Sequence, residues 1–431
     1  MNWSGRSDGD RKPRVVLFGL FGIGNIGNDG SLQAMLDMLR RERPQAELVC
    51  VCAGPDRVRK ALRVEARPMR ISNRARGLLR TLDRIFLGIP GLVADASHAF
   101  RTMRGADMMI VPGTGILDDL GEESYQMPLR LFMWCLAARL AGVHIAFASV
   151  GAGPIRNRLS RFLMLSAAKM AHYRSYRDGF SREYVSVHGI DTRNDPICPD
   201  VVFGLTVPEV PKREGSPFTL GLGVMDCRGW YGRGQEADAI YQTYISKVAF
   251  FAAWLVRNGF HIRILVGQES DRRAAVDMLR MMRACTGRNA AECIQVGPCG
   301  SLHDLMREIS RTDIVVATRY HSIVCALKMG RPSISIEYAP KNTEVMLGTG
   351  LGDYCETVEM FATDALIEKF QRLRRDYHYF QARIRTSVAL FQEALAEQDA
   401  RLLSILSERV ARRRSHPPIG VSAESMGDPT H

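Results

Sequence analysis

A chain of 431 residues is long enough to hold two or three domains, each with a buried hydrophobic core. Its net charge of +12 at pH 7 indicates an anionic partner, such as a phosphorylated substrate, an anionic membrane or a nucleic acid. Its 10 cysteines are scattered without a C-x-x-C pair. This spacing argues against a disulfide framework or a zinc site, so we expect reduced thiols and no metal.

The two ends of the chain, residues 1–13 and 415–431, are polar, and we expect both to be disordered. The N-terminal stretch lacks the apolar region of a signal peptide. No apolar run reaches the roughly 18 residues that a membrane-spanning helix needs. The sequence therefore predicts a cytoplasmic protein.

The first predicted domain, residues 14–195, opens with a strand at Arg14–Leu20, a glycine-rich turn, a helix at Ser31–Arg41 and a strand at Glu47–Ala53. The turn contains G-x-G-x-x-G, which indicates a dinucleotide site when an acid ends the second strand. That acid, Asp56, comes only after a further turn, so an NAD-dependent dehydrogenase is a weaker alternative. The turn and the helix N-terminus instead predict an anion or sugar site. Its candidate residues are Gly24, Asn25 and Asp29.

An insert at residues 57–104 combines many arginines with an apolar series from Leu78 to Val93. Its central arginines are Arg74, Arg76, Arg80 and Arg84. A basic amphipathic segment is typical of proteins that bind a membrane surface, but a helix packed on its own domain has the same pattern. Nucleic acid is not expected, because no aromatic or zinc module accompanies the arginines.

Three further strands are predicted in this domain, at 107–111, 143–150 and 173–176, and each ends in glycines or polar residues. Ligands bind at the carboxyl edge of such sheets, so these ends supply candidate site residues. They are Gly113, Gly115, Asp118, Asp119, Gly151 and Arg177. A proline-rich linker is expected at residues 196–217.

The second predicted domain, residues 218–360, repeats the strand–helix pattern. Its strand at 313–317 is followed by Arg319 and His321, with Ser322 expected to cap the next helix. The following strand, 333–338, brings Glu337 and Lys341 to the same edge. Cations, an imidazole and a carboxylate at one corner suit an anionic ligand and a proton transfer. The alternative is a structural histidine beside solvated charges.

The sequence thus predicts an α/β fold with two Rossmann-like domains facing a cleft, as in glycosyltransferases of the GT-B type. Residues 361–414 have a helical pattern, and we expect one long C-terminal helix that packs back across both domains.

Six motifs occur in order and together resemble the polysaccharide pyruvyl transferase family over about residues 14–350. They are GIGNIGNDGSL at 22–32, GTGILDD at 113–119, SVGAGPI at 149–155, YRD at 176–178, PDVVF at 199–203 and RYHSIVCALKMGRP at 319–332. The first loop departs from the family's usual G-N-x-G-D-E, Thr114 replaces a glycine, and Ala339 replaces the acid before Pro-Lys.

The resemblance implies transfer of pyruvate from phosphoenolpyruvate to a sugar, usually as a ketal, with no cofactor beyond this donor. It implies that Arg319 and Arg177 hold the donor and that His321 is the general acid. Asp119, or its neighbour Asp118, would accept the hydroxyl proton or orient the acceptor. A lipid-linked or nucleotide-linked saccharide would be the acceptor, and a lipid carrier would place the enzyme on the inner face of the plasma membrane. A GT-B glycosyltransferase that uses a sugar nucleotide and a non-enzymatic scaffold subunit are the alternatives.

Overall fold

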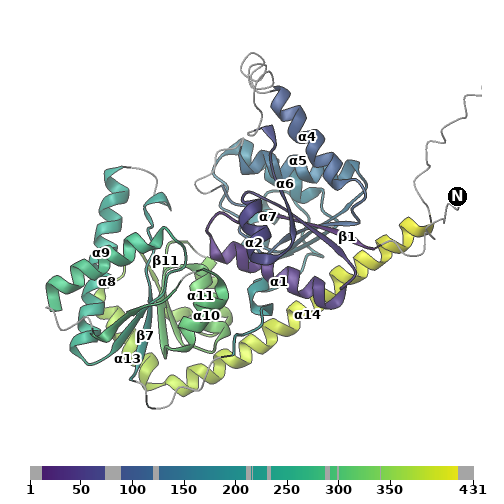
Figure 1. Cartoon of the computed structure of the whole chain (residues 1–431). Helices are drawn as coiled ribbons and strands as arrows, with labels where there is room; N and C mark the ends of the chain where they lie inside the picture. The colour runs from purple at the N-terminus through teal and green to yellow at the C-terminus, as the bar shows by residue number, and fades with distance from the viewer. Residues whose placement is uncertain are drawn as a thin grey trace, which may run out of the picture.

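The chain folds into two parallel sheets of six strands each, with helices on both faces (Figure 1). The computed structural model describes residues 12–72, 89–119, 126–209, 215, 217–230, 234–286, 292–298, 300–339 and 341–415. The predicted fold class, with two Rossmann-like halves and a long C-terminal helix, is confirmed.

The first sheet has the strand order β3-β2-β1-β4-β5-β6. Its strands are β1 (Arg14–Gly19), β2 (Glu47–Cys52), β3 (Glu65–Pro68), β4 (Met108–Pro112), β5 (His144–Val150) and β6 (Tyr173–Tyr176). The order reverses between β1 and β4, and this reversal is where ligands bind in open α/β sheets. The interior strands are buried along nearly their whole length, as expected for a sheet covered on both faces.

The second sheet repeats this topology, with the order β12-β11-β10-β7-β8-β9. Its strands are β7 (Thr219–Gly223), β8 (His261–Ile264), β9 (Ile294–Val296), β10 (Ile314–Ala317), β11 (Ser333–Glu337) and β12 (Cys355–Thr357). Here the order reverses between β7 and β10. The fold therefore has two switch points, one in each sheet.

Helices connect the strands in both halves. In the first half they are α1 (Ile26–Glu42), α2 (Pro55–Leu62), α4 (Ile89–Met103), α5 (Met127–Leu140), α6 (Arg158–Lys169) and α7 (Gly179–Val187). In the second half they are α8 (Gln235–Arg257), α9 (Asp271–Thr286), α10 (Leu302–Ser310), α11 (Tyr320–Lys328) and α12 (Lys341–Gly348). The short 3₁₀ turns η3 (Val201–Gly204) and η4 (Arg228–Trp230) lie in the loops before α8.

Helix α1 belongs to the first half but also contacts the second. A Cβ added to Gly30 would lie 2.1 Å from Leu302 of α10, so the two helices approach closely at this glycine. The buried core that contains α1 continues without a break into the second sheet through residues such as Leu305 and Ile323. The two halves are therefore held together by shared apolar packing.

The predicted insert at 57–104 is partly ordinary domain structure. Helix α2 leads into β3, which is the edge strand of the first sheet. Helix α4 is held by Asp95, which accepts hydrogen bonds from the backbone N–H groups of Ile71 (2.8 Å) and Ser72 (2.9 Å). The arginines at 74, 76, 80 and 84 lie outside the described residues. The membrane-surface prediction for this segment therefore remains a prediction.

The C-terminal segment is two helices rather than one, because α13 (Thr363–Arg375) and α14 (Tyr377–Ser415) are separated at Asp376. Helix α14 runs along both halves (Figure 1). Phe391 packs against Phe203 of η3, with ring centroids 5.0 Å apart. Farther along, the Gln398 amide donates to Ser149 Oγ (3.0 Å) in a buried contact with β5.

Helix α8 is long and apolar enough to cross a membrane by length and composition. It packs on α9 and α13, and side chains such as Tyr244, Val248 and Phe251 are fully buried. These contacts are typical of a core helix. Among the described residues, no cluster of His, Cys, Asp and Glu has the arrangement of a metal site.

Candidate functional site

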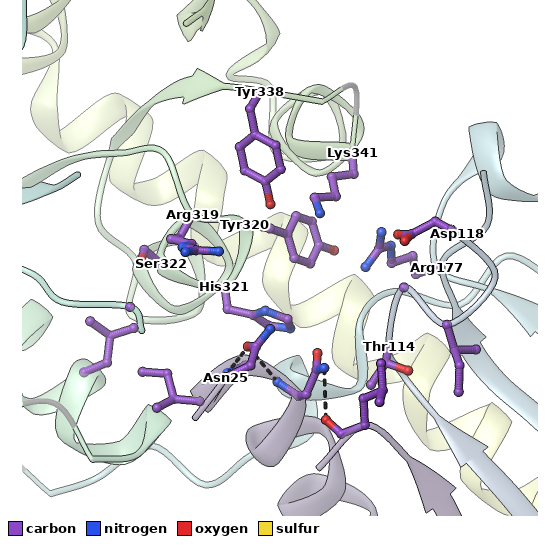
Figure 2. A pocket seen from close by; sticks show the side chains of 18 of the residues that line it. Asn25, Thr114, Asp118, Arg177, Arg319, Tyr320, His321, Ser322, Tyr338 and Lys341 are labelled. Atoms are coloured by element: carbon purple, nitrogen blue, oxygen red, sulfur yellow. Dashed lines mark hydrogen bonds between the residues drawn. The ribbon is translucent and has the colours of Figure 1, made fainter. Parts of the chain in front are cut away.

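The loops that follow β1, β4, β6, β10 and β11 converge on a cavity of about 190 Å³ between the two halves (Figure 2). It lies at the switch points of both sheets, as predicted from the tendency of ligands to bind at the carboxyl ends of parallel strands. Of the predicted site residues, the structure brings seven together around it: Asn25, Gly115, Asp118, Arg177, Arg319, His321 and Lys341. The remaining six lie elsewhere and are described below.

Arg177 is the most deeply buried cation of the cavity, with 6% of its side chain exposed. It follows β6, its Nε pairs with Asp178 Oδ2 (3.2 Å), and its guanidinium lies 4.7 Å from the centre of the Tyr320 ring. Gly151 gives it space, because a Cβ at that position would lie 2.4 Å from Arg177 Cζ. Gly151 therefore acts by close packing and does not itself line the cavity.

Arg319 presents only part of its guanidinium to the cavity. Its Nε and Nη2 donate to the two carboxylate oxygens of Asp271, at 2.9 and 2.7 Å, and that carboxylate is buried. This planar fork would be lost with lysine. Asp271 therefore binds two of the three guanidinium nitrogens of Arg319, and Nη1 is the third.

Helix α11 begins at Tyr320, with Arg319 as its N-cap residue, so the predicted capping role of Ser322 is wrong. Ser322 is already inside the first turn, and its buried Oγ has no hydrogen-bond partner among the described residues. The start of α11 and the start of α1, where Asn25 is the N-cap residue, both face the cavity. Their N-termini add positive potential to that of the side chains.

Lys341 is the third cation and comes from the start of α12. Its ammonium lies 4.8 Å from the ring centre of Tyr338 and 5.2 Å from that of Trp230. No carboxylate within the described part of the chain forms an ion pair with it. Figure 2 shows Lys341, Arg177 and Arg319 arranged around Tyr320 and His321. Cations from both halves of the molecule therefore surround one imidazole.

His321 packs against α1 of the first half. A Cβ on Gly27 would lie 2.0 Å from His321 Nδ1, so only glycine leaves room for the ring. Nε2 is buried and lies 3.7 Å from Asp200 Oδ2. Burial, and then the charges of Arg177, Lys341 and Arg319, lower the pKa of His321 to about 3. The imidazole is therefore neutral at pH 7.

Asp119 does not face the cavity, so the structure contradicts its predicted role as proton acceptor. Its two carboxylate oxygens accept hydrogen bonds from the backbone N–H groups of Arg156 and Asn157, both at 2.8 Å. The neighbouring residue, Asp118, does line the cavity, and its charge acts on the buried Arg177. Of the two neighbouring aspartates, Asp118 is therefore the one that lines the cavity.

Four other predicted residues hold the loops around the cavity. Glu337 accepts two hydrogen bonds from Thr343 at the start of α12, from Oγ1 (2.7 Å) and from the backbone N–H (2.9 Å). Asp29 accepts from the N–H of Gly22 (2.7 Å) and so fixes the glycine loop. The remaining two, Gly24 and Gly113, have φ values of +93° and +43° and are needed for the turns.

Sequence reasoning missed several residues that shape the site. Asp271 and Asp200 are buried carboxylates beside Arg319 and His321, and Tyr320 and Tyr338 supply aromatic rings to the cavity. Asp200 stands in the PDVVF motif, so the motif was noticed but its acid was not. Tyr320 stands between Arg319 and His321, where its ring position depends on the other half of the molecule.

We expect Asp119→Ala to lower the stability of the fold without weakening ligand binding. The substitution leaves two backbone N–H groups without their charged acceptor, which costs about 1–3 kcal/mol. Thermal unfolding measures the loss, and a donor titration of the folded variant measures binding. A variant of normal Tm with weakened binding would contradict this assignment of Asp119 to loop structure.

Solved structures with the same arrangement of two sheets extend over almost the whole chain. A Listeria monocytogenes protein described as a UDP-N-acetylglucosamine 2-epimerase has a TM-score of 0.59 and 12% identity, covering 93% of this chain and 98% of that one. A Neisseria meningitidis UDP-GlcNAc 2-epimerase bound to UDP-GlcNAc has a TM-score of 0.55 and 11% identity, covering 89% and 100%. A glycosyltransferase from Rickettsia africae has a TM-score of 0.55 and 11% identity, covering 93% and 99%. These likenesses show the fold alone.

A comparison with curated protein sequences finds no match. The family model for polysaccharide pyruvyl transferase matches residues 25–340. This range begins at the N-cap residue of α1 and reaches the loop after β11, so it contains the loops that supply Asp118, Arg177, Arg319 and His321 to the cavity. The chain belongs to the polysaccharide pyruvyl transferase family.

Proposed function

We propose that the protein transfers pyruvate from phosphoenolpyruvate to a sugar of a cell-surface glycan intermediate, forming a ketal. The observation that carries this proposal is the set of cations Arg177, Arg319 and Lys341 around His321. Phosphoenolpyruvate has a carboxylate and a phosphate, and such anions favour sites with arginine forks and helix N-termini. No protein cofactor is needed for this chemistry.

The reaction needs one proton donor and one proton acceptor. The π electrons between C2 and C3 of the donor take a proton and form the new C3–H bond, and a sugar oxygen then forms a bond to C2 and loses its proton. The C2–O bond to phosphate breaks, and phosphate leaves with the electron pair. A second sugar hydroxyl forms the second C–O bond, and its proton goes to the leaving phosphate.

His321 is our candidate for the proton donor, and donor binding itself would charge it. Burial, and then the charges of Arg177, Lys341 and Arg319, hold the pKa of His321 low, and the negative charges of phosphoenolpyruvate would offset the effect of the cations. The imidazole would then take up a proton as the donor enters the cavity. Asp118, on the opposite wall near Arg177, is our candidate to accept the proton of the attacking hydroxyl.

Phosphate release tests the proposal directly. The purified protein would be incubated with phosphoenolpyruvate and a panel of lipid-linked and nucleotide-linked saccharides, and free phosphate and the mass of the product would be measured. We expect phosphate release that depends on one saccharide and adds one pyruvate to it. Release of UDP from UDP-sugars, without reaction of phosphoenolpyruvate, would favour a sugar-nucleotide glycosyltransferase instead.

We propose in addition that the protein is cytoplasmic and binds reversibly to the inner face of the plasma membrane, where a lipid-linked acceptor would be found. Anionic lipid attracts each nearby Lys or Arg by about 1 kcal/mol. Exposed apolar side chains of α4, Ile89 and Val93 among them, lie in the same insert. Co-sedimentation with anionic vesicles should be strong at low salt and weak at high salt. It should disappear when Arg74, Arg76, Arg80 and Arg84 are changed to Glu, and wild type that ignores such vesicles would contradict the proposal.

A further inference from the structure

Asp200 is a buried carboxylate of the PDVVF motif to which the proposed reaction gives no role. It precedes η3 in the segment that connects the two halves, and its side chain is fully buried. Oδ1 accepts a hydrogen bond from the backbone N–H of Val202 (2.9 Å), which accounts for one oxygen. Oδ2 has no hydrogen-bond partner among the described residues. Buried polar atoms are normally paired, so this oxygen calls for an explanation.

His321 Nε2 is in the same situation as Asp200 Oδ2. It is buried and lacks a hydrogen-bond partner within the described part of the chain. The two atoms lie 3.7 Å apart, and a movement of about 1 Å gives a normal hydrogen bond. Catalytic hydrogen bonds are often long without substrate and shorten when it binds. One hydrogen bond between Asp200 Oδ2 and His321 Nε2 would therefore satisfy both atoms.

The η3 turn is placed firmly enough to hold Asp200 in position. It packs against α1, α11 and α14, and Lys328 of α11 donates a hydrogen bond to the Phe203 carbonyl of η3. Rigid backing is what a residue needs in order to orient another side chain. Gly27 packs against one face of the imidazole beside Nδ1, so the ring has little freedom to turn away.

We propose that Asp200 is a positioning residue that fixes the His321 imidazole with its proton on Nε2 and leaves Nδ1 to exchange a proton with substrate. In such pairs the carboxylate holds one tautomer and stabilises the imidazolium when it forms. No bond to Asp200 is made or broken in the reaction. The proton passes between Nδ1 and the substrate, and Asp200 stays a carboxylate at the end.

Charges around the pair agree with a carboxylate and a neutral imidazole at pH 7. Burial raises the pKa of Asp200 to about 6, against the opposing effect of Arg177, and the pKa of His321 is about 3. The charged and titratable groups that interact with one member of the pair are Arg177, Asp178, Arg319, Tyr320, Lys341 and Cys325. Of these groups, Arg177, Arg319 and Lys341 disfavour protonation of the His321 imidazole, and a bound anion would offset their effect.

The substitution Asp200→Asn tests the proposal with little change in shape. The Asn oxygen can still accept the hydrogen bond from the Val202 N–H. The Asn amide N–H₂ then replaces Oδ2 and is a donor, so His321 Nε2 must be the unprotonated acceptor. We expect nitrogen-15 NMR of the His321 ring to show the proton on Nε2 in wild type and on Nδ1 in the variant. The His321→Gln spectrum assigns the signals.

The kinetic part of the test rests on the proposed function. We expect kcat with phosphoenolpyruvate to fall by roughly 10²–10⁴ in Asp200→Asn, with KM for the donor changed less than about threefold. Asp95→Asn is the matched control, because it removes a buried carboxylate that also accepts backbone hydrogen bonds but lies on α4. It should keep normal kcat.

An unchanged tautomer in a folded Asp200→Asn protein would overturn the proposal, as would an unchanged kcat. If wild type does not turn over phosphoenolpyruvate with any acceptor, the proposed function fails, but the NMR result still decides whether Asp200 orients His321. The two failures are therefore distinguishable.

Discussion

Replacing His321 with alanine is expected to lower turnover of phosphoenolpyruvate by roughly 10²–10⁴, the usual effect of losing a positioned acid or base. Its imidazole stands among three cations at the meeting point of both sheets. Donor affinity should change little, because Arg177, Arg319 and Lys341 remain. Steady-state kinetics and a separate donor titration measure the two effects.

The matched control is His188→Ala, which removes the half-buried C-cap histidine of α7, whose Nδ1 contacts the Tyr184 carbonyl (2.7 Å). This variant should turn over normally. Circular dichroism and thermal unfolding check that both variants fold. Near-normal turnover in a folded His321→Ala protein would show that the proton comes from another group.

The second large effect is expected from Gly27→Ala. The added Cβ would lie 2.0 Å from His321 Nδ1, far inside contact distance, so either the ring or α1 must move. A displacement of about 1 Å at a catalytic group can cost on the order of 10² in rate. We expect kcat to fall by about this factor. Steady-state kinetics of the purified variant would measure it.

Gly30→Ala is the control for this substitution, because it lies one turn further along the same helix. Its Cβ would meet Leu302 Cδ1 at 2.1 Å, which is a clash at the same boundary between the two halves but away from the histidine. Both variants should lose stability. If both lose kcat equally, the effect of Gly27→Ala is general loosening of the boundary and not displacement of His321.

The sequence was sufficient to predict which side chains reach the edge of each sheet. Arg177, Arg319 and His321 directly follow buried strands, and the carboxyl ends of parallel strands meet at one edge. It was not sufficient to predict what each carboxylate binds. Asp119 lies in the loop after β4 and Glu337 is the last residue of β11, yet both turn toward nearby backbone N–H groups. Whether a carboxylate faces the cavity or a backbone N–H group depends on loop geometry, which the spacing of residues does not reveal.

Partners from distant parts of the chain were the other missing element. Asp200 is 121 residues from His321, and Asp271 is 48 residues from Arg319. Packing of η3 against α11 brings Asp200 to His321, whereas Asp271 and Arg319 meet within the second half, at the starts of α9 and α11. Strand β3 was likewise hidden in the arginine-rich segment, since four residues that contain Arg67 and Pro68 have little of the apolar pattern of a buried strand.

Helix α14 limits how the two halves can move. The chain passes between them twice, in the connecting segment and along α14, and the two passages touch where Phe203 meets Phe391. This double connection, together with the apolar core that α1 shares with the second half, opposes separation of the halves. Arg177 belongs to the first half and Lys341 to the second, and both line the cavity. A ligand that contacts both therefore meets cations whose spacing the connections already hold, so less of its binding free energy is spent on ordering the site.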